Sequence, residues 1–587
     1  MNHEARISPA HPPSLDAGTA RPAAPFPTLD PDRRLRETSQ RRAWPALVLI
    51  VSALAIWWVP LGLRWLHGPD EGRYAEIARE MLSSGDWVTP RLNGILYFEK
   101  PPLVYWATAL AFKLAGLNEF AARIWPALSA LLPLPPMWWV VRRSFDARTA
   151  TASVAILASS LWWIANGHFL TLDMSLSAFM TIGMLMVWAA NLPDTNERQA
   201  VLRMRIAWIA VALAVLSKGV VALVVPAAGL GAYVLATGDR QVLRRLSWFE
   251  GGLILFSLCG PWFLLMETHN PGFLKFFFIH EHLQRFTSTI HRRSGPLYYF
   301  IPILIVGAFP WTSFLPSLRH VAWRRRTAGL QVERFLTLQA LVIFGFFSVS
   351  GSKLPSYILP MFPPLAVLLA VRLQAVPAPR IGRHLLASTG VLAALTVIAG
   401  VVMTRGTTAS TSAGVGGFAI SVAFGLALLG GCGAWLSRWR ADAPSTHATL
   451  AAAMAALACS QIAIGGYQYI EAQRSPVRWL AQAAPHLGPS TPIYSVDTYD
   501  QTLPFYLRRP VTLVAYVDEF ETGLRREPQR QIPTLAAFAE RWRDEPGAVA
   551  ILSREAYELL TEAGSPMTPI AGDRRRVLVR QPGTQSR

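Results

Sequence analysis

The sequence predicts a mainly α-helical, polytopic membrane protein of about thirteen spans, with external amphipathic helices and a small C-terminal α/β domain. Three observations favour this fold class. The 587 residues are 52% hydrophobic and only 16% charged, whereas soluble globular domains are about one-quarter charged. Apolar runs reach the ~20 residues that a helix needs to cross a bilayer. Basic residues gather in the short loops between these runs, as the positive-inside rule describes.

The apolar runs place the spans along the chain. The first is predicted from about Trp44 to Leu66, and the later ones begin near Glu119, Thr149, Asp173, Ile206, Gly219, Leu246, Leu297, Arg334, Ser356, His384, Gly414 and Thr446. The segment 102–117 is interpreted as a surface-lying or re-entrant helix. Counting it as a span would move the later basic loops to the other face of the membrane.

The net charge of +19 does not indicate a nucleic-acid partner, because the arginines follow the membrane topology. With a cytoplasmic N-terminus, one face receives the basic loops Arg142/Arg143/Arg148, Arg203/Arg205, Arg240/Arg244/Arg245, Arg319/Arg324/Arg325/Arg326, Arg380/Arg383 and Arg438/Arg440. The predicted C-terminus is then external. The three cysteines all lie in apolar runs, which argues against a disulfide framework or a structural zinc site.

Composition divides the chain into three parts. Residues 1–43 are rich in Pro, Ala and Arg and are predicted to be a disordered cytoplasmic tail. Residues 44–470 form the transmembrane domain, whose first external loop is 67–118. Residues 471–587 are predicted to be an external α/β domain, with strands at Ile493–Val496, 511–517, 548–552 and 577–579 and a helix at 534–543.

The first external loop carries charge that topology does not explain. Tyr74, Ile77 and Met81 recur at helical spacing, so an amphipathic helix along the membrane surface is predicted. Asp70 and Glu71 stand at its start, where carboxylates complement the helix dipole. A helix cap is the structural interpretation. Two adjacent acids at the mouth of a membrane core favour catalytic carboxylates instead.

Three further groups of charged residues are candidates for a catalytic site that includes Asp70 and Glu71. Glu99 and Lys100 are followed by two prolines, which present the acid–base pair rigidly. Asp173 lies at the external start of a span, where a carboxylate is costly and therefore functional by default. Lys218 and Lys353 end spans on the same side, either as snorkelling lysines or as a cationic collar for a phosphate.

Sequence motifs extend these observations to a family. The strings GPDEGRYAEIAREM, FEKPPLVYW, TLDM, LSKG and SGSKLPSYILP, in this order, resemble the aminoarabinose transferases of Gram-negative bacteria. These are protein O-mannosyltransferase-like (GT-C) glycosyltransferases that use polyprenyl-phosphate donors. The similarity covers the chain from about Trp44 to the last span, and weakly the external domain.

The resemblance implies transfer of 4-amino-4-deoxy-L-arabinose from undecaprenyl phosphate to lipid A phosphates in the inner membrane. The site would face the periplasm, and the product would confer resistance to polymyxin and other cationic antimicrobial peptides. Partners would be the lipid-linked donor, lipid A and membrane lipid. A protein or another glycan as acceptor remains an alternative. A transporter of lipid-linked sugars is disfavoured, because the ionisable residues lie in external loops rather than at the bilayer midplane.

The resemblance also assigns residues. It implies Asp70 and Asp173 as catalytic acids, with Glu71 beside them. Lys100, Arg285 and Tyr357 match positions around the donor phosphate, and we add Arg73, Lys218 and Lys353 to that group. Tyr74 and Tyr97 are expected in the donor or acceptor pocket. Glu99 and His280 match a pair that would hold a divalent metal such as zinc or magnesium; no organic cofactor is expected.

Overall fold

Apolar helices long enough to cross a bilayer dominate the fold. The computed structural model describes residues 45, 47–284, 295–320, 330–404 and 409–582. Within these residues, nine helical segments have the length and composition of membrane spans, so the chain is a multi-pass membrane protein. They are α4 (Glu119–Leu131) with α5 (Leu134–Ser144), α8 (Leu172–Ala190), α9 (Glu197–Lys218), α12 (Trp248–His269), α16 (Val332–Val349), η5 (Pro355–Met361) with α17 (Phe362–Leu373), α18 (Ala378–Thr404), α19 (Ala409–Leu436), and α20 (Ser445–Gly466) with α21 (Gln468–Arg474).

The other four predicted spans coincide with shorter helices. These are Leu47–Gly62, α6 (Ala147–Ser159), α10 (Val221–Thr237), and η3 (Leu297–Tyr299) with α15 (Phe300–Gly307). The count of thirteen spans therefore stays a prediction. The segment predicted to lie on the surface forms α3 (Leu103–Ala115), which packs against α2 (Asp70–Ser84).

Short elements connect these helices. They are η1 (Val59–Gly62), the hairpin of β1 (Arg91–Leu92) and β2 (Ile95–Leu96), α7 (Leu161–Gly167), α11 (Gln241–Arg244), α13 (Phe273–Lys275), η2 (Phe276–Gln284) and η4 (Trp311–His320). The predicted disordered tail, residues 1–43, lies outside the described residues.

The C-terminal residues form a six-stranded sheet in the order β5-β4-β3-β6-β8-β7. Its strands are β3 (Ile493–Val496), β4 (Thr512–Val514), β5 (Gln531–Ile532), β6 (Val549–Ser553), β7 (Thr568–Gly572) and β8 (Arg576–Arg580). The first four are parallel, and β8 pairs antiparallel with both β6 and β7. The four predicted strands correspond to β3, β4, β6 and β8, whereas β5 and β7 were not predicted.

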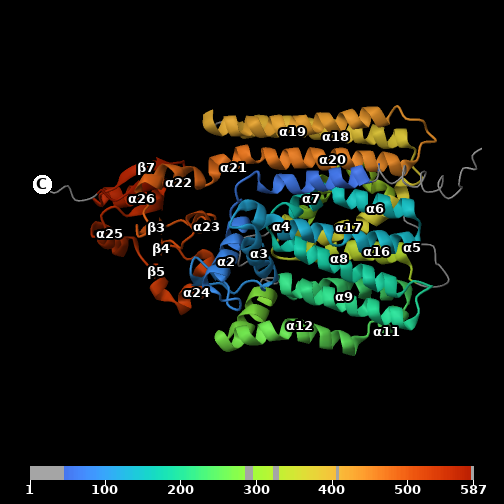
Figure 1. Ribbon diagram of the computed structural model, residues 1–587, viewed down its shortest axis with the longest axis horizontal. Coiled ribbons are helices and arrows are strands. Elements are labelled where there is room, and N and C mark those ends of the chain that lie inside the picture. Colours follow the sequence, from blue (N-terminus) through green and yellow to red (C-terminus); the bar gives the residue numbers. More distant parts are fainter. Residues whose placement is uncertain (1–44, 46, 285–294, 321–329, 405–408, 583–587) are drawn as a thin grey trace, which may run out of the picture. The chain divides into compact units, whose positions relative to one another are not determined.

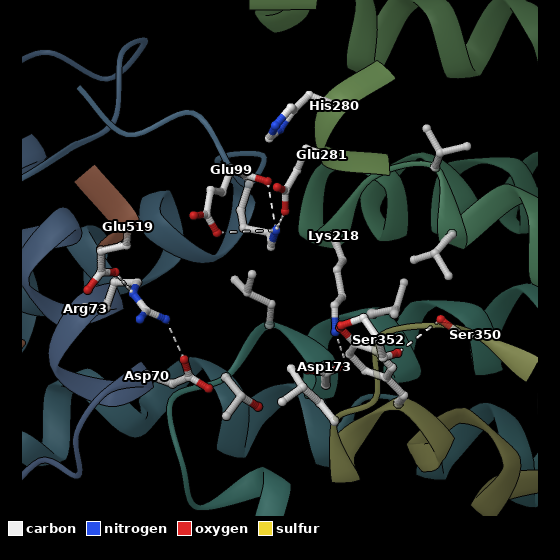
Figure 2. Close-up of a pocket in the computed structure, with 18 of the residues that line it drawn as sticks. Asp70, Arg73, Glu99, Asp173, Lys218, His280, Glu281, Ser350, Ser352 and Glu519 are labelled. Carbon is white, nitrogen blue, oxygen red and sulfur yellow. Dashed lines mark hydrogen bonds and ion pairs between the residues drawn. The ribbon is translucent and has the colours of Figure 1, made fainter. Parts of the chain in front are cut away.

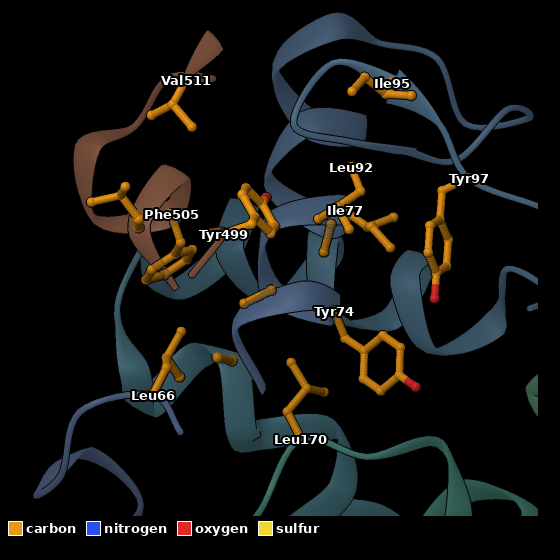
Figure 3. Packing of buried hydrophobic residues seen from close by; sticks show 14 of the residues in the cluster. Leu66, Tyr74, Ile77, Leu92, Ile95, Tyr97, Leu170, Tyr499, Phe505 and Val511 are labelled. Carbon is orange, nitrogen blue, oxygen red and sulfur yellow. The ribbon is translucent and has the colours of Figure 1, made fainter. Parts of the chain in front are cut away.

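Helices cover this sheet on both faces. They are α22 (Val477–Ala483), η6 (Ala484–His486), α23 (Leu503–Leu507), η7 (Asp518–Phe520), α24 (Glu521–Arg526), η8 (Pro528–Arg530), α25 (Leu535–Arg543) and α26 (Arg554–Glu562). On one face, Phe538 and Trp542 pack against Tyr494 and Val514. The opposite face packs with α2 and α3 into a shared cluster that includes Ile77, Leu92 and Phe505 (Figures 1 and 3).

Helix α2 differs from the predicted surface helix in its surroundings. It begins at Asp70 and ends at Ser84, and the following Gly85 has a φ of 73°, the left-handed conformation that glycine adopts at helix ends. Every residue from Glu71 to Met81 is buried, including the charged ones. The reason is that the C-terminal domain covers the polar face of α2. A Cβ on Gly72 would lie 2.6 Å from the backbone of Gln501 and Thr502.

Candidate functional site

A cavity of about 830 Å³ lies where several of these elements meet. Its lining comes from the start of α2, the loop before α3, the ends of α8, α9 and α16, η2, and the segment 517–522 of the C-terminal domain (Figure 2). The membrane helices contribute apolar side chains such as Leu176, Val221 and Phe347. The charged side chains come from the start of α2, the loop before α3, the cavity ends of α8 and α9, η2 and the C-terminal domain.

Asp70 lies on one side of this cavity and is tied to the C-terminal domain through Arg73. The guanidinium Nη1 of Arg73 donates to Asp70 Oδ1 at 2.7 Å, and its Nε donates to Glu519. Asp70 does not cap the helix, because the cap residue is Pro69 and no side chain makes a capping hydrogen bond. Burial raises the pKa of Glu519, while the charge of Arg73 opposes that effect.

Asp173 lies on the other side of the cavity and is surrounded by donors (Figure 2). The ammonium of Lys218 forms an ion pair with Asp173, and Ser356 Oγ donates to Asp173 Oδ2 at 3.0 Å. The same ammonium lies 4.5 Å from the ring centre of Tyr357, a cation–π distance. Lys218 is therefore held at the cavity by a carboxylate and an aromatic ring together.

Lys100 forms a third charged centre. Its ammonium pairs with Glu281 and lies 3.9 Å from Glu99 Oε2. His280 lines the cavity beside these carboxylates (Figure 2). The side chain of Lys100 is only 11% exposed, so its charge acts with little screening by water.

Glu71 is placed elsewhere, away from the cavity lining. Its carboxylate is buried between the guanidinium groups of Arg64 and Arg123 and also accepts from the backbone N–H groups of His67 and Leu170. Burial alone would raise the pKa of Glu71, but the two guanidinium groups outweigh it and hold this pKa well below its usual range. Such a contact set orients the start of α2.

The cavity thus unites most of the predicted site residues. Nine of them line it: Asp70, Arg73, Tyr74, Glu99, Lys100, Asp173, Lys218, His280 and Tyr357. Tyr97 is buried in the cluster beneath α2 instead. Lys353 is also buried, and its ammonium donates to the carbonyl of Ser350 at 2.6 Å. Arg285 lies outside the described residues.

Several residues at this site were not predicted. Asp518, Glu519, Glu521 and Glu281 line the cavity, and Arg123 holds Glu71. The sequence contained a signal for Arg123, because an arginine inside the apolar segment 119–131 is costly unless it has a buried partner. The acids at 518–521 carry no local motif, so nothing in the sequence linked them to residues more than four hundred positions earlier.

The fit of a divalent metal to Glu99 and His280 is incomplete. Within the described residues, no group of three or more His, Cys, Asp or Glu side chains is arranged to hold a metal ion. The ammonium of Lys100 already lies between the carboxylates of Glu99 and Glu281. The described side chains therefore supply two ligands, and a metal would need oxygen atoms from a substrate or from water.

The charged groups of the cavity suit the binding of a phosphate. Cationic side chains from α2, the loop before α3 and the end of α9 meet carboxylates in a partly buried cavity at the ends of membrane helices. Such cations bind phosphate oxygens strongly, because charge-assisted hydrogen bonds gain strength where water is excluded. The carboxylates Asp70 and Asp173 lie within the same cavity. The arrangement can therefore hold a phosphorylated lipid and act on the group that the phosphate carries.

Known protein families match two parts of the chain. The model described as "Dolichyl-phosphate-mannose-protein mannosyltransferase" matches residues 43–277. The model described as "Aminoarabinose transferase C-terminal domain" matches residues 479–581. The first match includes the start of α2 and Asp173, and the second includes the cavity-lining segment 517–522.

Curated relatives cover part of the chain. An "Undecaprenyl phosphate-alpha-4-amino-4-deoxy-L-arabinose arabinosyl transferase" of Edwardsiella ictaluri is 35% identical over 321 residues, which is 54% of this chain and 57% of that protein. A protein of the same name from Pseudomonas aeruginosa is 34% identical over 338 residues, 56% of this chain and 59% of that protein. The chain thus spans less than two-thirds of the length of these relatives.

Solved structures match over nearly the whole length. The crystal structure of ArnT from Cupriavidus metallidurans bound to undecaprenyl phosphate is 35% identical, with a TM-score of 0.84. The match covers 92% of this chain and 98% of that one. The apo form of the same protein is 34% identical with a TM-score of 0.83, covering 93% of this chain and 100% of that one.

Proposed function

Because the chain belongs to the aminoarabinose transferase family of GT-C glycosyltransferases, we propose that it transfers 4-amino-4-deoxy-L-arabinose from undecaprenyl phosphate to phosphate groups of lipid A. The observation that carries this proposal is the convergence of Arg73, Lys100 and Lys218 with Asp70 and Asp173 in one cavity at the ends of membrane helices. The relatives' names supply the donor, and the acceptor is inferred from the resemblance of the motifs.

The donor phosphate is held by the cationic side chains. Lys100 and Lys218 are each paired with a carboxylate from another element, so their positions are defined before the donor arrives. Preorganised cations stabilise the charge that develops on a leaving group without reorganisation during the reaction. We assign these two lysines, with Arg285 and Tyr357, to the phosphate of the donor.

The transfer step needs no strong base at the acceptor. An oxygen of the lipid A phosphate, already anionic, forms the new bond to C1 of the sugar, and the bond from C1 to the undecaprenyl phosphate oxygen breaks with its electron pair. Asp70 and Asp173 are assigned to orient the acceptor and to stabilise positive charge on the sugar ring. Glu71, buried with Arg64 and Arg123, acts as a positioning residue for α2.

The proposed location is the bacterial inner membrane, with the cavity facing the periplasm. The arginine-rich loops support this orientation, since basic loops remain on the cytoplasmic side. Adding an amino sugar to lipid A lowers the negative charge of the envelope. Bacteria that carry the enzyme would therefore bind polymyxin and other cationic peptides less strongly.

We propose separately that a divalent metal ion binds beside the donor phosphate. A zinc or magnesium ion would be held by Glu99 and His280 and would complete its coordination with oxygen atoms of the donor phosphate and water. There it would add positive charge beside the leaving phosphate.

The decisive experiment is transfer with purified full-length protein. The protein is incubated with synthetic undecaprenyl-phosphate-linked 4-amino-4-deoxy-L-arabinose and with lipid A, and lipid A is analysed by mass spectrometry. We expect lipid A carrying one or two added sugars. Unmodified lipid A, together with transfer to a protein or to another glycan offered in parallel, would refute the proposed acceptor.

A further inference from the structure

Among the cavity-lining residues that the structure describes, acids outnumber permanent cations. Among the described lining residues, three side chains are permanently cationic: Arg73, Lys100 and Lys218. Seven carry carboxylates: Asp70, Glu99, Asp173, Glu281, Asp518, Glu519 and Glu521. A cavity that served only an anionic phosphate would be expected to have the opposite excess. An acid of this lining that pairs with no described cation is therefore available to a ligand with a positive group.

The ion pairs show which of these carboxylates already have a cationic partner and which could bind a positive group of a ligand. Arg73 pairs with Asp70 and Glu519, Lys100 with Glu99 and Glu281, and Lys218 with Asp173. Glu521 pairs with Arg525 on the exposed face of α24. Asp518 has no ion pair within the described part of the chain. Its carboxylate is exposed to the cavity and accepts one hydrogen bond, from the hydroxyl of Tyr516 at 3.3 Å.

A second, independent feature is a tyrosine hydroxyl that faces the same cavity without a protein partner among the described residues. Tyr74 lines the cavity, is only 7% exposed, and its hydroxyl makes no hydrogen bond with any residue that the structure describes. Because this hydroxyl faces the cavity, a ligand there that donates to it or accepts from it adds a hydrogen bond that the protein does not supply. Arg73 connects the two features, since it lies 5.9 Å from the ring centre of Tyr74 and pairs with Glu519, the neighbour of Asp518.

We propose that Asp518 and Tyr74 recognise the protonated amino group and the adjacent hydroxyl of the donor sugar, and so select a cationic sugar over a neutral one. This inference rests on the proposed function and extends it to the C-terminal domain. C4, which carries the ammonium, lies across the pyranose ring from C1, which carries the phosphate. Figure 2 shows Glu519, the sequence neighbour of Asp518, on one side of the cavity and Lys218 on the other, so the two ends of the sugar ring can reach different walls.

The fold holds Asp518 firmly for such a role. The neighbouring Phe520 is 1% exposed and anchors η7 in the cluster shared with α2. The φ of Asp518 is +28°, a conformation that favours Asp and Asn over other non-glycine residues. The substitution Asp518→Asn therefore keeps the backbone preference and the size of the side chain while it removes the charge.

The test compares two lipid donors that differ only at C4, one with the amino group and one with a hydroxyl group. Binding of each donor and its KM and kcat are measured for the wild type and for Asp518→Asn. We expect the wild type to prefer the amino donor. The substitution should raise its Kd and KM by about tenfold to a hundredfold, the effect of one hydrogen bond to a charged group. The hydroxyl donor should change by less than about twofold.

Controls separate this inference from the proposed function. Asp544→Asn makes the same change at an exposed position of the same domain and should leave both donors unaffected. An unchanged preference in Asp518→Asn, or equal losses for both donors, would overturn the inference while transfer itself continues. If the wild type transfers neither sugar, the proposed function fails. The binding data then still decide whether Asp518 distinguishes the amino group.

Discussion

Arg123 holds Glu71 with a two-pronged ion pair, in which Nε donates to Oε1 at 2.7 Å and Nη2 donates to Oε2 at 2.9 Å. Arg64 adds a third contact at 3.0 Å, and all three side chains are almost completely buried. The remaining donors of Arg123 bind the carbonyls of Leu61, Arg64 and Trp65. The start of α2 is thereby fixed to η1, to the residues that follow it and to α4.

Replacement of Glu71 should therefore destabilise the fold. Glu71→Gln leaves two buried guanidinium groups without their counter-charge, and loss of one partner of a buried pair costs about 3–5 kcal/mol. We expect a lower midpoint of thermal unfolding in detergent. Glu250→Gln, which removes the exposed pair with Arg205, serves as the control and should leave the midpoint unchanged. Equal midpoints for Glu71→Gln and wild type would contradict the positioning role.

Asp70→Asn should abolish transfer without affecting folding. Asp70 makes no capping hydrogen bond, and asparagine suits the start of a helix about as well as aspartate. The neutral amide, however, cannot stabilise positive charge on the reacting sugar. The measurements are unfolding midpoint and lipid A modification, side by side with wild type. Normal modification by this variant would falsify the catalytic role.

Lys100→Ala should weaken donor binding. Loss of a charge-assisted contact to the phosphate typically costs about 1.5–3 kcal/mol, so the donor KM should rise about tenfold or more. The exposed Lys113, in the last turn of α3, provides the matched control as Lys113→Ala. If both variants bind the donor like the wild type, Lys100 does not hold the phosphate.

The metal hypothesis predicts a loss of bound ion. Elemental analysis of the wild type with donor should find zinc or another divalent metal, and Glu99→Ala and His280→Ala should each lower its content and the transfer rate. Incubation with a chelator should have the same effect. A fully active, metal-free preparation would show that Glu99 and His280 serve another purpose, such as positioning Lys100.

Stability should fall from acid to neutral pH because of Glu80. Burial and the charge of the neighbouring Glu76 raise the pKa of Glu80 to about 8, while the unfolded value stays near 4.5. Between these values the folded state keeps a proton that the unfolded state loses. The free energy of unfolding therefore falls by at most about 1.4 kcal/mol per pH unit.

Glu80→Gln tests this expectation, because the amide resembles the protonated acid and does not titrate. Unfolding between pH 5 and 8 should depend less on pH in this variant than in the wild type. Glu558→Gln, on the exposed face of α26, should retain the wild-type dependence. Parallel curves for all three proteins would show that Glu80 is not the responsible group.

Local sequence patterns predicted which segments form helices and strands better than they predicted which segments pack against one another. Strand β3 was predicted with its observed ends, since three of its four residues, Ile493, Tyr494 and Val496, favour strands and turn residues flank them. Strand β5, with two residues, and β7, with Pro569 in it, lack that pattern. The spacing of Tyr74, Ile77 and Met81 predicted α2 but not its burial, because the covering residues Gln501 and Thr502 are far away in the chain.

The same distinction applies to the site. The sequence could identify four charged residues that the membrane topology does not account for: Asp70, Lys100, Asp173 and Lys218. Glu519 could not be identified, since an acid in a polar segment has no unusual local feature. Glu281 stands beside an aromatic run and two histidines, but this pattern gave it no specific role. Glu71 and Asp70 are adjacent in sequence, yet their side chains point in different directions. Glu71 points into a buried cluster of ion pairs, and Asp70 points toward the cavity. Only the packing distinguishes them.

The contact between α2 and the C-terminal domain has a consequence for synthesis of the protein. Gly72 and Arg73 leave the ribosome long before Thr502 and Glu519, which cover them. At about 5–20 residues per second, the delay is roughly 20–90 s. During this interval the charged face of α2, including Glu76 and Arg79, must remain hydrated at the membrane surface. The cavity is therefore completed among the last events of biogenesis, and unfinished chains remain inactive.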